Sequence, residues 1–298
     1  MKVRSIIIGF VLLFAACGEP TRQTQIPDTV TDDYGRSVVV PSRPVRVVSL
    51  SPSVTEIMYA LGAGDLLVGR TDFCVFPPEA ENIPSIGGIS NLNIESILSH
   101  RPDLVISGSM VSRKAADQLE KTGTPMVCVI EKPKFEALYE NIRTIGRLVG
   151  KEKEADSLNA LLVGTWRAIS ASKSPSSLAD TARRVPTCYY VVGFGPAGNF
   201  TAGGNTFIND IIRMAGGHNI AENVSGWSYS LEALMKEDPD YIIVRREDSA
   251  AFCSMKPYNT LRAVRKGHVI GMVSGTMDLQ VPRNIDAVLY LRERIKEQ

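Results

Sequence analysis

Two glutamates stand at matching points of a unit that the chain uses twice. The stretches LNIESILSHRPDLVI (92–106) and YSLEALMKEDPDYII (229–243) each place a small polar residue and an aliphatic residue before a glutamate, Glu95 or Glu232. A Pro-Asp pair follows each glutamate at the same spacing and leads into an apolar run. The helix dipole alone stabilises an acid in a first turn by about 0.3–1 kcal/mol. Because both halves repeat the arrangement, we expect a pair of carboxylates on one rim, docking onto a symmetric partner that carries arginines.

No motif typical of an enzyme accompanies these acids. Gly193, Gly195 and Gly198 match G-x-G-x-x-G, but Pro196 interrupts the motif and a loop follows it, so a glycine-rich hairpin is the better interpretation. A serine-hydrolase elbow and a C-x-x-C pair are both absent from the sequence. The histidines are widely separated: His100, His218 and His268. We therefore expect no enzymatic activity, no metal centre and no cofactor.

Other side chains are suited to holding a ligand. Arg245 and Arg246 end an apolar run, where paired guanidinium groups could bind carboxylate, phosphate or catecholate groups; solvated surface arginines are the alternative. Phe194 and Phe200 would present apolar faces from the glycine-rich hairpin. Trp227 could form a flat apolar wall, although packing in a core is equally compatible with the sequence.

The composition describes a globular protein. The chain has 298 residues, of which 44% are hydrophobic and 22% charged, and this length favours two compact units of ordinary size. Its 33 basic and 32 acidic residues leave a formal net charge of +1. Nucleic-acid binding would require clustered basic residues and a high isoelectric point, so the sequence does not favour that class.

The first residues have the pattern of an export signal. Residues 1–16 combine a basic start with an apolar run that is too short to cross a hydrocarbon layer of roughly 30 Å. The run ends in Phe-Ala-Ala-Cys, which resembles a bacterial lipobox, and we expect cleavage before Cys17 and diacylation of its thiol. A plain secretory leader is the alternative. Residues 17–45 would then be a lipidated tether with a first strand, at the membrane and facing the periplasm or the exterior.

Alternating apolar runs and helical patterns predict the scaffold. We expect an N-terminal lobe over 46–133, a linker over 134–182 and a C-terminal lobe over 183–298, each lobe an α/β unit with a mostly parallel sheet. Residues 151–173 lack proline and repeat apolar residues at helical spacing, which predicts one long helix of about 33 Å between the lobes. One stiff helix permits less closure than several flexible strands would.

Two local patterns refine this scaffold. Ser53 followed by Glu56 predicts a capping box, which makes Glu56 a helix-start residue rather than a catalytic acid. Cys128 and Cys188 lie inside apolar strands and should be buried, inert thiols. In open α/β sheets a ligand binds beyond the carboxyl ends of the strands. Residues that follow the strands are therefore the candidate binding residues.

The ordered set of motifs resembles a known family, the periplasmic or lipid-anchored substrate-binding proteins of ABC importers for iron-siderophores, haem and vitamin B12. The resemblance rests on DDYGRSVVVPSRPVRVVSLSPSVTEIMYALG, VGRTDF followed by PPEA, the two repeated units and FTAGGNTFINDIIRMAGGHNIA. It implies two α/β lobes bridged by a long helix, with a shallow interlobe cleft for the ligand. It also implies that Glu95 and Glu232 engage arginine pockets on a dimeric permease powered by cytoplasmic ATPase subunits.

The resemblance implies a monomeric receptor that captures a metal chelate. VGRTDFCVFPPEA and GGISNLNIE look most like the cobalamin-binding branch, so a corrinoid ranks first, a ferric siderophore second and haem third. An exported enzyme with a dinucleotide or hydrolase site is a more distant alternative. The residues expected to contact the ligand are Arg70, Phe73, Cys74, Ile89, Ser90, Ser109 and Met110 in the first lobe and Phe194, Phe200, Thr201, Trp227, Arg245, Arg246 and Arg283 in the second. Cys74 could instead be an inert thiol or form a disulfide with Cys253.

Overall fold

Two parallel four-stranded sheets of identical topology form the two lobes. The computed structural model describes residues 28–89, 92–171, 184–196 and 198–296. The N-lobe sheet has the order β4 (Leu67–Arg70), β3 (Val47–Ser49), β5 (Leu104–Ser107) and β6 (Met126–Cys128). The C-lobe sheet has the order β8 (His218–Asn219), β7 (Thr187–Tyr190), β9 (Tyr241–Arg245) and β10 (Val269–Met272). All pairings within both sheets are parallel, which confirms the predicted α/β class with mostly parallel sheets.

Helices cover both sheets and link them. The N-lobe helices are α1 (Pro52–Ala60), α2 (Ile94–Ser99) and α3 (Arg113–Glu120). The C-lobe helices are α6 (Phe207–Ala215), α7 (Leu231–Glu237), α8 (Ser249–Ser254) and α9 (Arg262–Arg265). The linking helices are α4 (Ala137–Leu148), α5 (Glu152–Ala171) and α10 (Asn284–Lys296). Short 3₁₀ turns lie at Gly64–Leu66, Pro78–Asn82, Arg246–Asp248 and Tyr258–Thr260.

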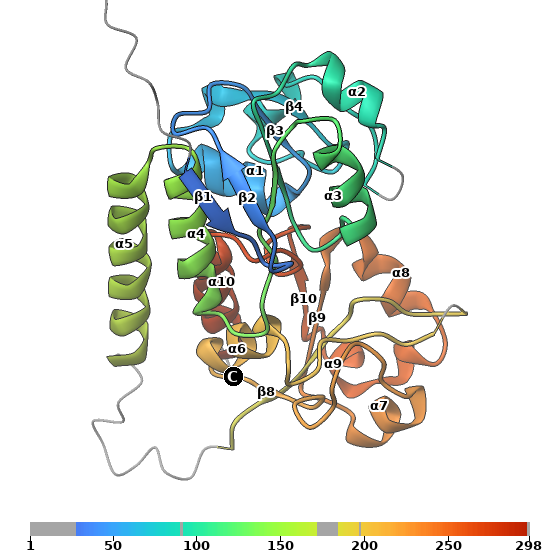
Figure 1. Ribbon diagram of the computed structural model, residues 1–298. Helices are drawn as coiled ribbons and strands as arrows, with labels where there is room; N and C mark the ends of the chain where they lie inside the picture. The colour runs from blue at the N-terminus through green and yellow to red at the C-terminus, as the bar shows by residue number, and fades with distance from the viewer. Residues whose placement is uncertain (1–27, 90–91, 172–183, 197, 297–298) are drawn as a thin grey trace, which may run out of the picture.

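Helix α5 is the predicted connector and runs along one side of the molecule from the N-lobe toward the C-lobe (Figure 1). It has 20 residues and packs against α4 and α10. Gly146 lets α4 and α5 approach closely, because a Cβ atom at this position would lie only 2.6 Å from the Cβ of Ala155. The C-terminal part of the predicted linker, residues 172–182, lies outside the described residues.

The main hydrophobic core is continuous from one lobe to the other. One cluster of buried side chains includes Val47 of β3, Ile142 of α4, Leu162 of α5, Ile243 of β9 and Leu291 of α10. Smaller clusters occupy the outer side of each sheet. Because close-packed interiors resist deformation, this shared core restrains the lobes on the α4–α10 side.

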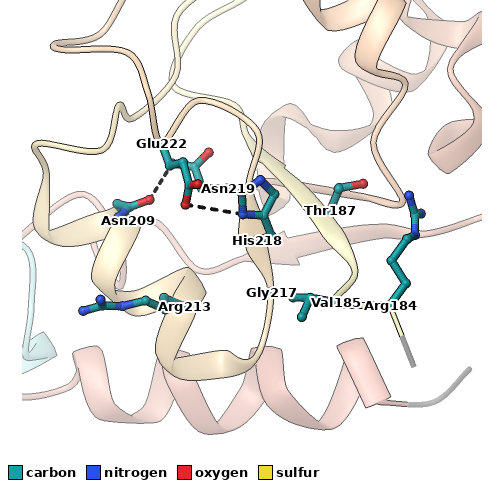
Figure 2. Close-up of a pocket in the computed structure, with 9 residues that line it drawn as sticks. All are labelled: Arg184, Val185, Thr187, Asn209, Arg213, Gly217, His218, Asn219 and Glu222. Carbon is teal, nitrogen blue, oxygen red and sulfur yellow. Dashed lines mark hydrogen bonds and ion pairs between the residues drawn. The ribbon is translucent and has the colours of Figure 1, made fainter. Parts of the chain in front are cut away.

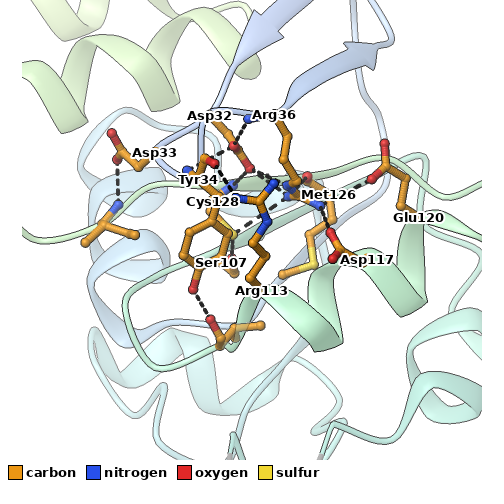
Figure 3. A network of polar contacts seen from close by, with 12 residues as sticks. Asp32, Asp33, Tyr34, Arg36, Ser107, Arg113, Asp117, Glu120, Met126 and Cys128 are labelled. Carbon is orange, nitrogen blue, oxygen red and sulfur yellow. Dashed lines mark hydrogen bonds and ion pairs between the residues drawn. The ribbon is translucent and has the colours of Figure 1, made fainter.

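The first described residues form an antiparallel hairpin of β1 (Asp28–Thr31) and β2 (Ser37–Val40) that packs on the N-lobe. In its turn, the buried Asp32 and Arg36 form an ion pair of 2.6 Å. Arg36 also donates to the carbonyl oxygen of Met126, and the amide of Cys128 donates to Asp32, so the turn is tied to β6 (Figure 3). The single first strand expected within residues 17–45 is therefore one arm of a hairpin. The leader and Cys17 lie outside the described residues.

The predicted capping box at Ser53 and Glu56 is wrong. Helix α1 begins at Pro52 with Ser51 as its N-cap, and Ser53 is already inside the helix. The Ser53 hydroxyl donates to the carboxylate of Glu131, and Glu56 pairs with Arg283 of the other lobe. Both side chains thus have distant partners instead of capping the helix. Within the described part of the chain, no helix is both long and apolar enough to span a membrane.

Candidate functional site

The two repeated units have the same local structure. Asn93 and Ser230 are the N-caps of α2 and α7, and each side chain accepts a hydrogen bond from the backbone amide three residues later. Glu95 and Glu232 follow in the first turns, and both are exposed. Because the capping interaction fixes where each helix begins, the two carboxylates occupy equivalent positions in the two lobes.

The Pro-Asp pairs complete the equivalence. The residues before the two prolines, Arg101 and Asp238, both have left-handed backbones, with φ angles of 48° and 42°. Asp103 then accepts from two backbone amides just before β3, and Asp240 accepts from the amide and hydroxyl of Thr187 at the start of β7. Each unit is thereby fixed to the first strand of its own lobe.

Helices α2 and α7 lie at the outer ends of the two lobes, on the side of the molecule away from α5 (Figure 1). Their sheets have corresponding strand orders, with β5 following α2 and β9 following α7. The molecule therefore presents one exposed acidic helix start per lobe on its α5-distal side.

Residues 273–283, which we call the interlobe segment, connect β10 to α10 and contact both lobes. Asp278 accepts hydrogen bonds from the Tyr190 hydroxyl and from Arg245 at the carboxyl ends of β7 and β9. The buried Gln280 accepts from the backbone amide of Lys132 at 3.3 Å and donates to the carbonyl oxygens of Lys132 and Lys134. This segment holds the strand ends of the C-lobe beside the segment that follows β6.

Three of the four arginines expected to contact a ligand have protein partners. Arg283 forms a bidentate pair with Glu56, at 2.6 and 2.7 Å, and stacks over the ring of Phe76. Arg245 pairs with Asp278 at 3.2 Å. Arg70 donates to three backbone carbonyl oxygens of its own lobe. The fourth, Arg246, is exposed and makes no ion pair among the described residues.

Large apolar side chains expected at the ligand site are exposed in both lobes. In the N-lobe, Phe73 and Met110 expose 59% and 73% of their surface. In the C-lobe, Trp227 and Phe200 expose 48% and 37%. Phe194 is half-buried and packs edge-on against Phe252. Exposed apolar groups of this size are typical of surfaces that bind a partner or a bulky ligand.

The glycine-rich stretch forms the expected hairpin and positions these rings. Phe200 pairs with Gly193 on one side and with Ser228 on the other. Downstream, a Cβ atom at Gly204 would lie 1.8 Å from the carbonyl oxygen of Glu222, so only glycine permits this backbone approach. The contact brings the FTAGG segment against the loop that carries Trp227.

Three side chains on the predicted list face the interior instead of a ligand. Cys74 and Thr201 have no exposed surface, and Ile89 is 7% exposed. The thiol of Cys74 contacts the hydroxyl of Thr71, and Thr201 donates to the carbonyl oxygen of Tyr190. Burial therefore keeps these three side chains from direct contact with a ligand. Ser90 lies outside the described residues.

All four described cysteines are free, so the structure contains no Cys74–Cys253 disulfide among the residues that it describes. Cys128 and Cys188 are buried as predicted. Burial raises the pKa of the Cys128 thiol and raises that of Cys188 to about 12. Both groups are therefore protonated thiols rather than nucleophiles at neutral pH.

Sequence reasoning missed a polar group at the carboxyl ends of the N-lobe strands. Ser51, Ser53, Ser109 and Glu131 follow β3, β5 and β6 and are joined by hydrogen bonds; we call them the Glu131 seat. Ser109 was on the predicted list, but Glu131 was not. The strand-end rule could have found Glu131, because it follows the apolar run MVCVI.

The C-lobe has a depression of about 420 Å³ that lies apart from the carboxyl ends of its strands (Figure 2). Its lining includes the start of β7, the edge strand β8 and α6, which places it at the amino ends of strands. Its polar groups are largely paired with one another: His218 with Glu222 at 3.3 Å, and Asn219 with Asn209 at 3.1 Å. This depression is therefore separate from the strand ends where a ligand is expected.

The chain belongs to the periplasmic binding protein family, whose model matches residues 47–274. It is 30% identical to the uncharacterized ABC transporter substrate-binding lipoprotein YvrC of Bacillus subtilis, over 99% of this chain and 98% of the relative. It is also 30% identical to a cobalamin-binding protein of Halobacterium salinarum, over 89% of this chain and 73% of the relative.

A solved structure agrees with the fold. A possible iron-binding, periplasmic solute-binding protein from Staphylococcus epidermidis superposes with a TM-score of 0.71 at 26% identity, covering 86% of this chain and all of that chain. These relationships confirm the family resemblance inferred from the motifs. The chain is an extracytoplasmic substrate-binding protein of the ABC importer class.

Proposed function

We propose that this protein is the lipid-anchored receptor of an ABC importer and that it captures a corrinoid between its lobes for delivery to the permease. The repeated unit is the observation that carries this proposal. Two lobes of identical strand order present Glu95 and Glu232 in equivalent first turns, both exposed. Such a pair suits a permease of two similar halves, each offering arginines to one carboxylate.

Three features support an interlobe ligand. Exposed apolar groups occur in both lobes, among them Phe73, Met110 and Trp227. The interlobe segment brings the carboxyl ends of the C-lobe strands beside the N-lobe. A relative with 30% identity is a cobalamin-binding protein. Among these features, the cobalamin-binding relative favours a corrinoid over a ferric siderophore or haem and favours a binding role over an enzymatic one.

Visible absorption and native mass spectrometry of the purified protein test the ligand. Each candidate, dicyanocobinamide, a ferric tricatecholate and haemin, has its own chromophore. We expect a one-to-one complex of a protein monomer with the corrinoid. Binding of haemin or of the ferric chelate alone would refute the corrinoid assignment.

Docking is tested by the charge reversal Glu95→Lys combined with Glu232→Lys. We expect this double variant to abolish uptake of the corrinoid by cells while its affinity for dicyanocobinamide stays unchanged. Glu152→Lys combined with Glu293→Lys is the control, because it alters net charge equally at exposed positions on α5 and α10. Equal loss of uptake in both double variants would refute a docking role for the repeated unit.

Anchoring through Cys17 belongs to the same proposal. The hairpin turn fixes the start of the described chain to the N-lobe, and the polar residues before it are long enough to serve as a tether. Cys17→Ser should release the protein from membranes. Metabolic labelling with a radioactive fatty acid measures the modification. We expect the label in the natural protein and none in Cys17→Ser.

A further inference from the structure

The Glu131 seat has the chemistry of a hydrogen-bond acceptor. One carboxylate oxygen of Glu131 accepts from the Ser53 hydroxyl at 2.5 Å, and Ser53 lies 2.8 Å from the Ser51 hydroxyl. The other oxygen accepts from the hydroxyl and the amide of Ser109. Since an ionised carboxylate offers about four acceptor directions, acceptor capacity remains for a further donor.

The seat is anionic and accessible. Glu131 is half-buried and Ser109 is exposed. Among the residues that the structure describes, Glu131 makes no ion pair with a lysine, arginine or histidine. The backbone also leaves room for the seat, because a Cβ atom at Gly108 would lie 2.6 Å from the Ser51 hydroxyl oxygen. An uncompensated carboxylate held in place by serines attracts N–H donors and repels anions.

The seat lies beside the junction of the lobes. The backbone amide and carbonyl of Lys132, the next residue along the chain, form hydrogen bonds with the side-chain amide of Gln280 in the interlobe segment. Across this junction, Arg283 and Arg245 are already paired with Glu56 and Asp278. Of the four arginines expected at the ligand, only the side chain of Arg246 makes no ion pair or hydrogen bond among the described residues, so little positive charge remains to neutralise a ligand's carboxylates.

We propose that the Glu131 seat selects the ligand by its periphery, binding primary carboxamide N–H groups and excluding ligands whose corresponding groups are carboxylates. This inference rests on the proposed corrinoid receptor and adds a specificity determinant to it. A corrinoid edged with carboxamides matches the seat. A porphyrin with propionates and a tricatecholate do not, because their charge has the same sign as that of Glu131.

Two ligands that share one ring isolate this effect. Dicyanocobinamide carries carboxamides where dicyanocobyrinic acid carries carboxylates, so the ratio of their dissociation constants measures the preference. We expect the natural protein to prefer dicyanocobinamide and Glu131→Ala to reduce that preference at least tenfold, since the variant loses a charge-assisted hydrogen bond to the carboxamide and the repulsion of the carboxylates. Glu131→Gln, which keeps one acceptor oxygen without the charge, should give an intermediate ratio.

Glu152→Ala is the matched control, because it removes one exposed acid from α5. It should leave the preference unchanged. If Glu131→Ala fails to fold, as judged by circular dichroism, Glu131→Gln and Ser109→Ala carry the test. If the folded variants keep both the preference and tight cobinamide binding, selection by the Glu131 seat is refuted, while the proposed receptor function is not. A natural protein that binds neither corrinoid overturns the corrinoid assignment and the seat together.

Discussion

Asp103 and Asp240 show how single side chains fix the repeated unit in place. Each follows a proline, and each accepts hydrogen bonds from the chain at the first strand of its own sheet. Asp240 also pairs with Arg184 and Arg262. Burial opposes its ionisation, but the Thr187 donors and these guanidinium groups hold the pKa of Asp240 below its ordinary value.

This shift predicts a pH-dependent stability. Because the pKa of Asp240 is lower in the folded state, its contribution is present above the unfolded value of about 3.9 and is lost as the pH falls through the folded value. We expect Asp240→Asn to lower the free energy of unfolding by about 2 kcal/mol at neutral pH and by progressively less below about pH 4. Urea titrations across this range measure the difference. Asp286→Asn, at an exposed position on α10, is the control, and a pH-independent difference for Asp240→Asn would contradict the assignment.

At the residue scale, local rules succeeded where the partners are local. The first-turn positions of Glu95 and Glu232 follow from caps within their own units. The same rules failed for Glu56 and Arg283, because those residues are 227 positions apart and meet only after the lobes pack. An arginine after a strand looks the same in sequence whether it binds a ligand or an internal acid.

At the scale of elements, the contact between α4 and α5 depends on one small residue. Gly146 faces Ala155 so closely that any side chain would force the helices apart. Gly164, in α5, has no atom within 4 Å of the position that a Cβ would take. The two glycines therefore provide a matched pair, one required by packing and one not.

The pair predicts opposite effects of the same substitution. Gly146→Ala should destabilise the protein by about 1–3 kcal/mol, because overpacking displaces a helix. Gly164→Ala should stabilise it by about 0.5–1 kcal/mol, because alanine is the better helix former. Chemical unfolding of both variants measures these changes. Stabilisation of both would show that α5 moves outward at no cost.

The long helix, the strands and the parallel sheets could be predicted because hydrophobic periodicity reports burial directly. The strand β8 was missed, since it has two residues and too short a pattern to recognise. The sequence predicts one strand where β1 and β2 form a hairpin, because the ion pair of Asp32 and Arg36 that fixes the turn depends on contacts with the distant β6.

At the scale of the whole molecule, the lobes are coupled by more than the connecting helix. They share a hydrophobic core, and Gln280 and Arg283 of the interlobe segment bind the N-lobe directly. Glu56 and Arg283 have side chains that are 5% and 14% exposed, so their pairing takes place largely away from water. Removal of one partner would leave the other charge buried and uncompensated.

This coupling predicts a non-additive pair of substitutions. Glu56→Ala should lower the free energy of unfolding by about 3 kcal/mol, because it leaves Arg283 without its partner. Combining Glu56→Ala with Arg283→Met should restore part of that loss, since no unpaired charge remains. A double-mutant cycle from chemical denaturation gives the interaction energy. Additive effects would mean that the pair contributes nothing to joining the lobes.

The duplicated topology has a consequence for recognition. Under the proposed docking of Glu95 and Glu232, two bound orientations that differ by a half-turn make the same contacts with a permease of two similar halves. The receptor would then not need to match a particular lobe to a particular half of the permease, which doubles the number of productive approaches. Any preference for one of the two orientations must then come from surfaces where the lobes differ, such as the C-lobe loop that carries the exposed Trp227.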